Sequence, residues 1–296
     1  MFTNPAQAAA WLTETVMEFM KSPVNDLHMP GGHEPAYGMP LIGFASGSDL
    51  LWEAYKKEHV GDFHWTPVEA FALRYPEETV DASELSVMSW ILPQTEATRN
   101  DQRKAGNLPS ERWARARIFG EDFVNKGLRR HLLTKLEEKN VRAVAPHLLE
   151  AWKSVDSEKY VFASTWSERH AAYAAGLGTF GLCDGLITPA GKAMRAGSLV
   201  IRLELPATER PYTHHQEYCL YFSSGTCGVC MKRCPIDAIT PEGHDKRRCR
   251  AYLREVTAPY VEDTWHFKGY GCGFCQIGVP CEKSIPRRPK VVKTAR

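Results

Sequence analysis

The chain has 296 residues, of which 43% are hydrophobic and 24% charged, a globular composition that excludes disordered, collagenous and coiled-coil proteins. The formal net charge of +2 gives no bulk electrostatic reason to expect a nucleic-acid or membrane partner. No apolar run of about 18 residues predicts a transmembrane helix, and the first residues show neither a signal-peptide pattern nor a twin-arginine pair. We therefore expect a cytoplasmic protein of about two domains.

Hydrophobic spacing predicts the first elements in chain order. A helix is expected from about Pro5 to Lys21, followed by a Pro- and Gly-rich loop over residues 22–49. The near-continuous apolar run from Leu85 to Pro93 predicts a buried strand that the proline ends. Ser110 is a suitable N-cap for a long helix that continues to about Lys139.

Shorter elements follow in the next 70 residues. Strands are predicted at Val141–Val144 and Val161–Ala163, and a third over Gly197–Leu205. A helix is predicted from Thr165 to Ala175, capped by Ser164 or Thr165 and ended by the glycines at 176 and 178. Strands mixed with long helices predict an α/β or α+β core of about 200 residues.

Several side chains in this region have two interpretations. A surface loop or contact with a cofactor is expected for His28, His33 and Tyr37. Arg115 and Arg117 are either solvated or bind an anion. The tryptophans Trp65, Trp90 and Trp166 either pack in the core or stack on a flat ligand.

Cysteine placement is the most informative feature of the sequence. None of the first 182 residues is a cysteine, Cys183 stands alone, and eight cysteines fall between Cys219 and Cys281. Cys227, Cys230 and Cys234 have the C-x2-C-x3-C-P spacing of bacterial ferredoxins. Such a concentration in a chain without an export signal favours metal binding over a disulfide framework.

Eight thiolates suit two [4Fe–4S] clusters. Because the cysteine before the proline ligates the other cluster in two-cluster ferredoxins, the first set is predicted to be Cys219, Cys227, Cys230 and Cys281, and the second Cys234, Cys249, Cys272 and Cys275. Paired C-x2-C motifs also occur in zinc sites, so zinc is the alternative, with structural thiols a third interpretation. Cys183 is either a buried free thiol or a residue near the cofactor.

The segment before these cysteines resembles epoxyqueuosine reductases and reductive dehalogenases. The shared features are the Ala-Gly-Leu-Gly turn at 175–178, the Leu-Ile-Thr-Pro sequence at 186–189, Gly197 and Ser198 before an apolar strand, and the cysteine spacing. The resemblance covers roughly residues 85–285. It implies a nitroreductase-like, cobalamin-binding core at residues 85–210 and a ferredoxin-like module with two [4Fe–4S] clusters at 211–285. Residues 1–84 would be a helical and loop segment packed on the core, and 286–296 a basic tail that is either solvated or an RNA- or acidic-partner patch.

The resemblance also implies site residues. Cofactor contacts are expected at Gly176, Gly178, Thr188, Gly197 and Ser198, and catalytic roles at Tyr160, Glu168, Arg169, His170 and Tyr173. An ion pair that holds the helix is the alternative role for Glu168, and an ordinary histidine is the alternative for His170. Phe162 occupies the position where epoxyqueuosine reductases carry an Asp, so a different proton donor, with Tyr160 as the candidate, is expected.

We therefore expect an iron–sulfur reductase in which base-off cobalamin reduces a C–X or C–O bond of a small-molecule or nucleoside-type substrate. An external donor of the ferredoxin or flavodoxin type would supply electrons, and no nucleic-acid or membrane partner is expected. The alternative is an electron-transfer protein of the ferredoxin type without a corrinoid, or with a flavin. The sequence indicates no oligomeric state.

Overall fold

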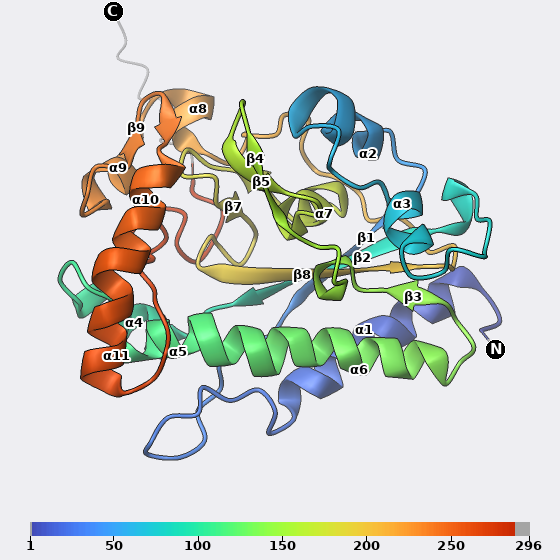
Figure 1. Ribbon diagram of the computed structural model, residues 1–296, viewed down its shortest axis with the longest axis horizontal. Coiled ribbons are helices and arrows are strands. Elements are labelled where there is room, and N and C mark those ends of the chain that lie inside the picture. Colours follow the sequence, from blue (N-terminus) through green and yellow to red (C-terminus); the bar gives the residue numbers. More distant parts are fainter. Residues whose placement is uncertain (1, 288–296) are drawn as a thin grey trace, which may run out of the picture.

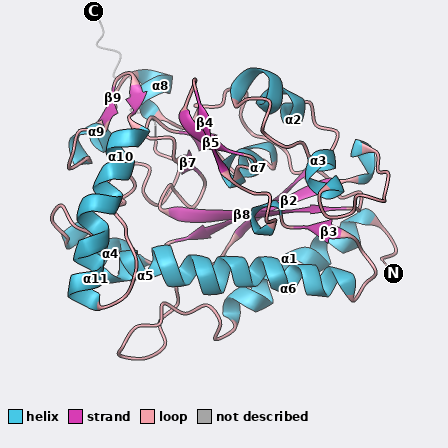
Figure 2. Cartoon of the chain, viewed as in Figure 1, coloured by secondary structure: helices cyan, strands magenta, loops and turns pink. Residues whose placement is uncertain are grey.

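A four-stranded antiparallel sheet forms the centre of the protein (Figures 1 and 2). The computed structural model describes residues 2–287. Across the sheet the strands are β1 (Leu41–Ser46), β2 (Ser86–Pro93), β8 (Met194–Ile201) and β3 (Ala143–Val144). Every residue of β2 is buried, because β2 is an inner strand covered on both faces, and the strand predicted at this place is confirmed.

The outer strand β1 was not predicted from the sequence. It lies within the Pro- and Gly-rich stretch expected to be a loop, so that expectation is wrong for residues 41–46. Gly43 is needed in the strand because a Cβ there would lie 2.2 Å from the carbonyl oxygen of Ala175. The glycine that indicates a loop in the sequence therefore allows β1 to pack closely against the backbone at Ala175. Residues 1–84 consequently contribute a strand to the central sheet as well as packing on it.

Helices α1 (Pro5–Lys21) and α6 (Lys126–Glu137) lie together on one side of the sheet (Figure 1). Their buried faces share one core with the sheet. Asn4 caps α1, accepting a hydrogen bond from the Gln7 amide. The predicted helix over 5–21 is confirmed.

The helix expected from Ser110 is interrupted. Ser110 caps α5 (Glu111–Phe119), as predicted, but a π-helical turn at Gly120–Asn125 separates α5 from α6. Gly120 packs so closely on Tyr37 that a Cβ would lie 2.6 Å from the phenol oxygen. π-Helical turns re-aim side chains within a helix, and this one ends in the buried Asn125, which accepts from the Trp90 indole at 2.9 Å.

On the opposite side of the sheet lies α7 (Glu168–Ala174) with a short antiparallel hairpin of β4 (Ser154–Ser157) and β5 (Val161–Ser164) (Figure 1). Ser167 caps α7, rather than Ser164 or Thr165, because those two side chains bond to the backbone of the chain before the helix. Gly176 follows the helix with a φ of +78°, the left-handed conformation that glycine tolerates. The other short elements here are α2 (Leu51–Ala54), α3 (Pro67–Ala72), α4 (Glu96–Lys104), β6 (Thr179–Phe180) and β7 (Leu186–Ile187).

The strand β8 is shifted from its expected position. It starts at Met194 and ends at Ile201, instead of running from Gly197 to Leu205. The chain turns away after Ile201, where Arg202 forms ion pairs with Glu78 and Glu84.

The cysteine-rich segment, residues 211–287, packs against one end of the sheet and against α4 and α5 (Figure 1). It contains α8 (Leu220–Ser224), α9 (Val229–Arg233), β9 (Ile239–Thr240), β10 (Gly243–His244), α10 (Lys246–Tyr252) and α11 (Ala258–Trp265). Most of the predicted basic tail lies outside the described residues. No helix within residues 2–287 is long and apolar enough to cross a membrane.

Candidate functional site

The structure brings together the four cysteines of the first predicted cluster set. Cys219, Cys227, Cys230 and Cys281 all line one narrow cavity. Apolar side chains, among them Leu182 and Ile187, line the same cavity. Cysteines separated by up to 62 positions in the sequence thus face one narrow, mostly apolar cavity.

The second predicted set is also close in space. Burial, with the nearby Cys249 and Cys234, raises the pKa of Cys272 to about 12. Cys275 is likewise beside Cys272, and the pKa of Cys275 lies well above its usual value, mainly because of a hydrogen bond with Cys183 and burial. Thiols that disfavour each other's ionised form are typical of a site that a cation would neutralise.

Cys183 lies between the two sets. It is 5% exposed and within hydrogen-bonding reach of Cys230 of the first set and Cys275 of the second. Those two hydrogen bonds, with the positive charge of Lys192, hold the pKa of Cys183 well below its usual value. The Nζ atom of Lys192 is 3.1 Å from the Cys183 sulfur. Cys183 is buried and outside any disulfide, and because it lies between the two predicted sets, both interpretations of its role stay open.

None of the nine cysteines forms a disulfide. Among residues 2–287, no three His, Cys, Asp or Glu side chains are arranged to hold a single metal ion.

A polar cluster beside the second set contains two of the predicted catalytic residues. Tyr160, in the turn of the β4–β5 hairpin, has the Lys246 ammonium 5.2 Å from its ring centre. Lys246 also lies 4.0 Å from the Asp184 carboxylate, and Arg169 donates to the Asp184 carbonyl. His244 is 3.1 Å from the same carboxylate. The sequence did not predict Lys246, Asp184 or His244, since Asp184 lies 60 positions before His244 and no motif links it to the segment of His244 and Lys246.

His244 connects this polar cluster with the cysteines. Burial lowers the pKa of His244, but Asp184 and Cys249 outweigh it, and the net result is a pKa of about 10. A cleft of about 660 Å³ opens between the hairpin and α10, lined by Phe162, Arg247 and Arg250 among others. Val161, next to Tyr160, has a φ of +68°, a conformation rarely adopted by β-branched residues and one that occurs at functional sites.

Glu168, another predicted catalytic residue, is held in the interior. Its carboxylate accepts from Arg129 at 3.0 Å and from the Ser198 hydroxyl at 2.5 Å. Burial raises the pKa of Glu168, although Arg129 and Ser198 act in the opposite direction. Glu168 is therefore in the ion pair that was its alternative interpretation, and Arg129 is the partner.

His170 and Tyr173 point to aromatic neighbours. The His170 ring packs edge-on against Tyr55 at 4.8 Å, and burial together with His64 lowers its pKa well below the usual value. Tyr173 packs against Tyr212 at 5.1 Å. The structure therefore does not gather the five predicted catalytic residues at one point, and only Tyr160 and Arg169 share the polar cluster.

The predicted cofactor contacts have protein partners in the structure. A Cβ at Gly176, Gly178 or Gly197 would lie within 2.6 Å of protein atoms, and the Thr188 hydroxyl donates to the Gly191 carbonyl. Ser198 is bonded to Glu168 and to the Trp166 indole, at 2.9 Å from the latter. All five residues thus have close protein neighbours or protein hydrogen-bond partners, and their role as cofactor contacts remains a prediction.

Most of the residues with two interpretations pack or form polar contacts within the protein, and His33 is the exception. Trp90 and Trp166 are buried in the core and Trp65 packs against it. The Tyr37 phenol donates to the Ala116 carbonyl, whereas His33 is exposed. The His28 ring packs on Phe123. Arg115 forms an ion pair with Glu111, and Arg117 donates a hydrogen bond to the Tyr270 hydroxyl. Neither arginine is simply solvated.

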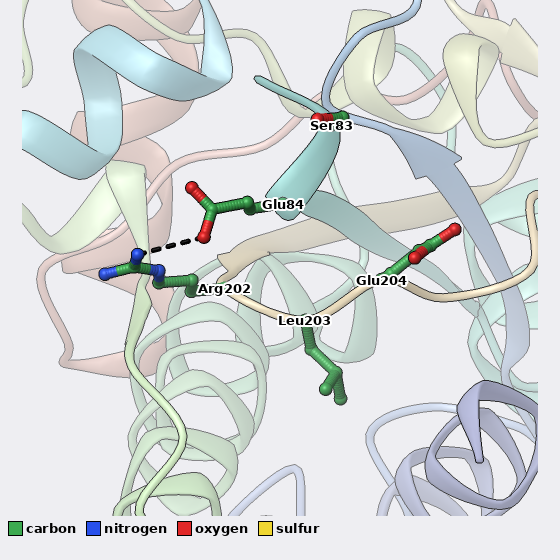
Figure 3. A pocket seen from close by; sticks show the side chains of 5 residues that line it. All are labelled: Ser83, Glu84, Arg202, Leu203 and Glu204. Atoms are coloured by element: carbon green, nitrogen blue, oxygen red, sulfur yellow. Dashed lines mark hydrogen bonds and ion pairs between the residues drawn. The ribbon is translucent and has the colours of Figure 1, made fainter. Parts of the chain in front are cut away.

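A separate surface pocket lies at the end of β8 (Figure 3). It is lined by Ser83, Glu84, Arg202, Leu203 and Glu204, and the Arg202 guanidinium lies 2.9 Å from Glu84. None of the predicted site residues lines this pocket.

Curated proteins similar to this chain are epoxyqueuosine reductases. The enzyme of Leadbetterella byssophila is 34% identical over 113 residues, which cover 36% of this chain and 34% of that protein. The enzyme of Vibrio cholerae is 28% identical over 190 residues, which cover 62% of this chain and 46% of that protein. The chain thus spans about a third to just under half of these relatives' length. No model of a protein family matches.

Solved structures with a similar fold belong to the same two groups. An epoxyqueuosine reductase bound to an epoxyqueuosine-modified tRNA stem loop aligns with a TM-score of 0.52 at 18% identity, over 96% of this chain and 68% of that one. A reductive dehalogenase, whose structure bears on B12-dependent dehalogenation, aligns with a TM-score of 0.52 at 13% identity. The alignment covers 97% of this chain and 33% of that one. The tRNA stem loop is the partner of that solved epoxyqueuosine reductase, and the expectation that nucleic acid is an unlikely partner of this chain stays a prediction. The similarity of this chain to the epoxyqueuosine reductases and reductive dehalogenases, predicted from its sequence, is confirmed.

Proposed function

We propose that the chain is an iron–sulfur oxidoreductase that binds two [4Fe–4S] clusters and passes their electrons to base-off cobalamin, for reduction of a C–X or C–O bond. The observation that carries the proposal is the convergence of Cys219, Cys227, Cys230 and Cys281 on one narrow cavity. The names of the curated relatives, all reductases, support the reaction class.

The thiols supply the ligands of the clusters. Because iron binds thiolate, uptake of a cluster requires each ligating thiol to lose its proton. Burial keeps the pKa of Cys281 above its usual value, so cluster binding is expected to weaken at low pH. The apolar lining at Leu182 and Ile187 limits access of water to the first cluster, which is one way a protein sets the reduction potential.

Cobalamin is part of the proposal because a solved relative carries out B12-dependent dehalogenation. When bound, cobalamin would supply the low-potential chemistry that breaks the substrate bond. We assign no residue of this chain to the corrin and no step to it, since the five expected contacts have protein partners.

Tyr160 is proposed to hold the proton that the reduced product requires. Its phenol lies beside the cationic Lys246, and the cleft next to it has room for a small-molecule or nucleoside-type substrate. Lys246 donates to the Phe162 carbonyl at 3.2 Å and so ties the hairpin to α10. Replacing Tyr160 with Phe removes only the hydroxyl, and we expect turnover to fall by about 10²–10⁴-fold with unchanged cluster content. Unchanged turnover would remove Tyr160 from the mechanism.

Anaerobic reconstitution with iron, sulfide and hydroxocobalamin tests the function. The proposal predicts cluster absorbance, an EPR signal after reduction and a bound corrinoid. Iron and sulfide without a bound corrinoid would favour the alternative, an electron carrier of the ferredoxin type without a corrinoid or with a flavin.

A further inference from the structure

We propose that the ammonium group of Lys192 is a fixed positive charge between the two cluster sites that raises the reduction potential of the clusters. This inference rests on the proposed function, because it concerns how the iron–sulfur site is tuned. Lys192 is neither a proposed cluster ligand nor the proposed proton donor.

The side chain of Lys192 is fixed in the interior. It is 3% exposed and lines the cavity shared by the first set of cysteines. Its backbone amide donates to the Cys281 carbonyl at 2.8 Å, so a backbone hydrogen bond joins the lysine to a proposed cluster ligand. A Cβ at Gly185 would lie 2.8 Å from the Lys192 Cδ atom, which shows how tightly the stem is enclosed.

The turn that presents Lys192 is equally constrained. Gly191 has a φ of +86°, and a Cβ there would lie 2.2 Å from the Glu282 carbonyl oxygen. Residues 191 and 192 therefore press against the chain around Cys281, and the ammonium has little freedom to move away.

Within residues 2–287, the polar partner of this ammonium is the sulfur of Cys183. Among the ion pairs of residues 2–287 none joins Lys192 to a carboxylate, and the buried Glu282 carboxylate is already paired with Arg99 and Arg103. The Nζ atom contacts Cys183, which itself reaches Cys230 and Cys275, one cysteine from each set. A buried ammonium is stable only beside compensating negative charge, so the thiolates and the clusters they hold are its counter-charge.

A positive charge in this place has a defined redox consequence. Reduction of a [4Fe–4S] cluster adds one electron, supplied by the external donor, and hence one negative charge to the cluster. A cation within the protein interior stabilises the reduced form more than the oxidised form, because the attraction increases with the charge of the cluster and is little screened there.

The test compares Lys192→Met, which keeps the length of the stem, with Lys192→Arg, which keeps the charge. Lys232→Met, at an exposed lysine on the cysteine-bearing α9, is the matched control. Each reconstituted protein is titrated anaerobically against reductant with EPR detection, after its iron and sulfide are counted. In K192M we expect half-reduction of the clusters to require a roughly tenfold higher ratio of reduced to oxidised mediator. This corresponds to a reduction potential about 59 mV lower for a one-electron couple. The potentials of K192R and K232M should stay near that of the unsubstituted chain.

Each outcome bears on the inference. Full iron content with an unchanged potential in K192M would overturn it. If K192M does not retain clusters, Lys192→Gln takes its place. Clusters that K192R retains and both neutral variants lose would support a role for the positive charge. Loss of clusters in K192R as well would overturn the inference, because the fit of the lysine side chain and not its charge would then be decisive. If the unsubstituted chain binds no iron and sulfide, the proposed function itself fails. That failure is seen in the iron and sulfide content before any variant is titrated, so it is distinct from an unchanged potential in K192M.

Discussion

Arg129 shows how a single buried charge organises the core. It is 0% exposed, and its guanidinium lies 3.0 Å from Glu168 and 3.3 Å from Glu121. Removing one partner of a buried ion pair leaves an uncompensated charge, which typically costs about 3–5 kcal/mol. We therefore expect Arg129→Met to lower the free energy of unfolding by about 3–5 kcal/mol in chemical denaturation.

The neighbouring Arg130 is exposed and serves as the control. Arg130→Met should change the stability by no more than about 0.5 kcal/mol, as surface substitutions usually do. Equal stability of R129M and R130M would contradict the role given to the buried pair.

His147 makes the stability depend on pH. Burial, followed by the charge of Arg129, lowers the pKa of His147 from 6.5 to about 4. Because the folded-state pKa lies below the unfolded one, the folded protein binds fewer protons between these values. The stability contribution is complete above pH 6.5 and is lost as the pH falls toward 4.

His147→Gln tests this dependence. The fall in the free energy of unfolding between pH 6.5 and 4 should become smaller by about 2–3 kcal/mol, following the pKa difference. Denaturant titrations at several pH values measure it. The exposed His33→Gln is the matched control and should keep the full slope; a slope equally steep in H147Q would disprove the contribution.

The sequence reveals only part of this residue-scale picture. The apolar spacing around residue 128 indicates which face of the helix is buried, but Arg129 reads as one of several polar helix positions. Only the fold brings it to Glu168, 39 positions later, and to Glu121. The pairing of buried charges is a tertiary property without a local signal.

At the scale of elements, β8 depends on a glycine. A Cβ at Gly197 would lie 2.4 Å from the Trp90 indole on the neighbouring strand. Overpacking of this kind usually costs about 1–3 kcal/mol, and we expect Gly197→Ala to lower the free energy of unfolding by that amount. Gly106→Ala is the control, because no atom lies within 4 Å of its added methyl group. A G197A protein as stable as G106A would refute the close packing.

Elements were predictable where one physical signal dominates. Regular apolar spacing gives α1, and an unbroken apolar run gives β2. The sequence cannot show β1, since its glycine indicates a loop until the packing against Ala175 is known. The π-helical turn at Gly120–Asn125 likewise has no local signal in the sequence, and the close approach of Gly120 to Tyr37 is visible only in the fold.

At the scale of the whole molecule, the cysteine spacing was the strongest guide. The ferredoxin-type motif, with the rule that its last cysteine ligates the other cluster, led to one predicted set of Cys219, Cys227, Cys230 and Cys281, and the fold gathers those four around one cavity. The position of Cys183 and Lys192 between the sets could not be predicted, because neither belongs to a motif and their contact depends on the turn at residues 188–192. The unexpected partners of Tyr160 in the polar cluster likewise come from distant segments.

The central claim is that the cysteines hold two iron–sulfur clusters. The most direct measurement is the iron and acid-labile sulfide content of protein reconstituted without oxygen, for the unsubstituted chain, Cys281→Ser and Cys183→Ser. We predict about eight irons and eight sulfides per chain, a clear loss in C281S and full content in C183S. Zinc in place of iron, without acid-labile sulfide, would contradict the account.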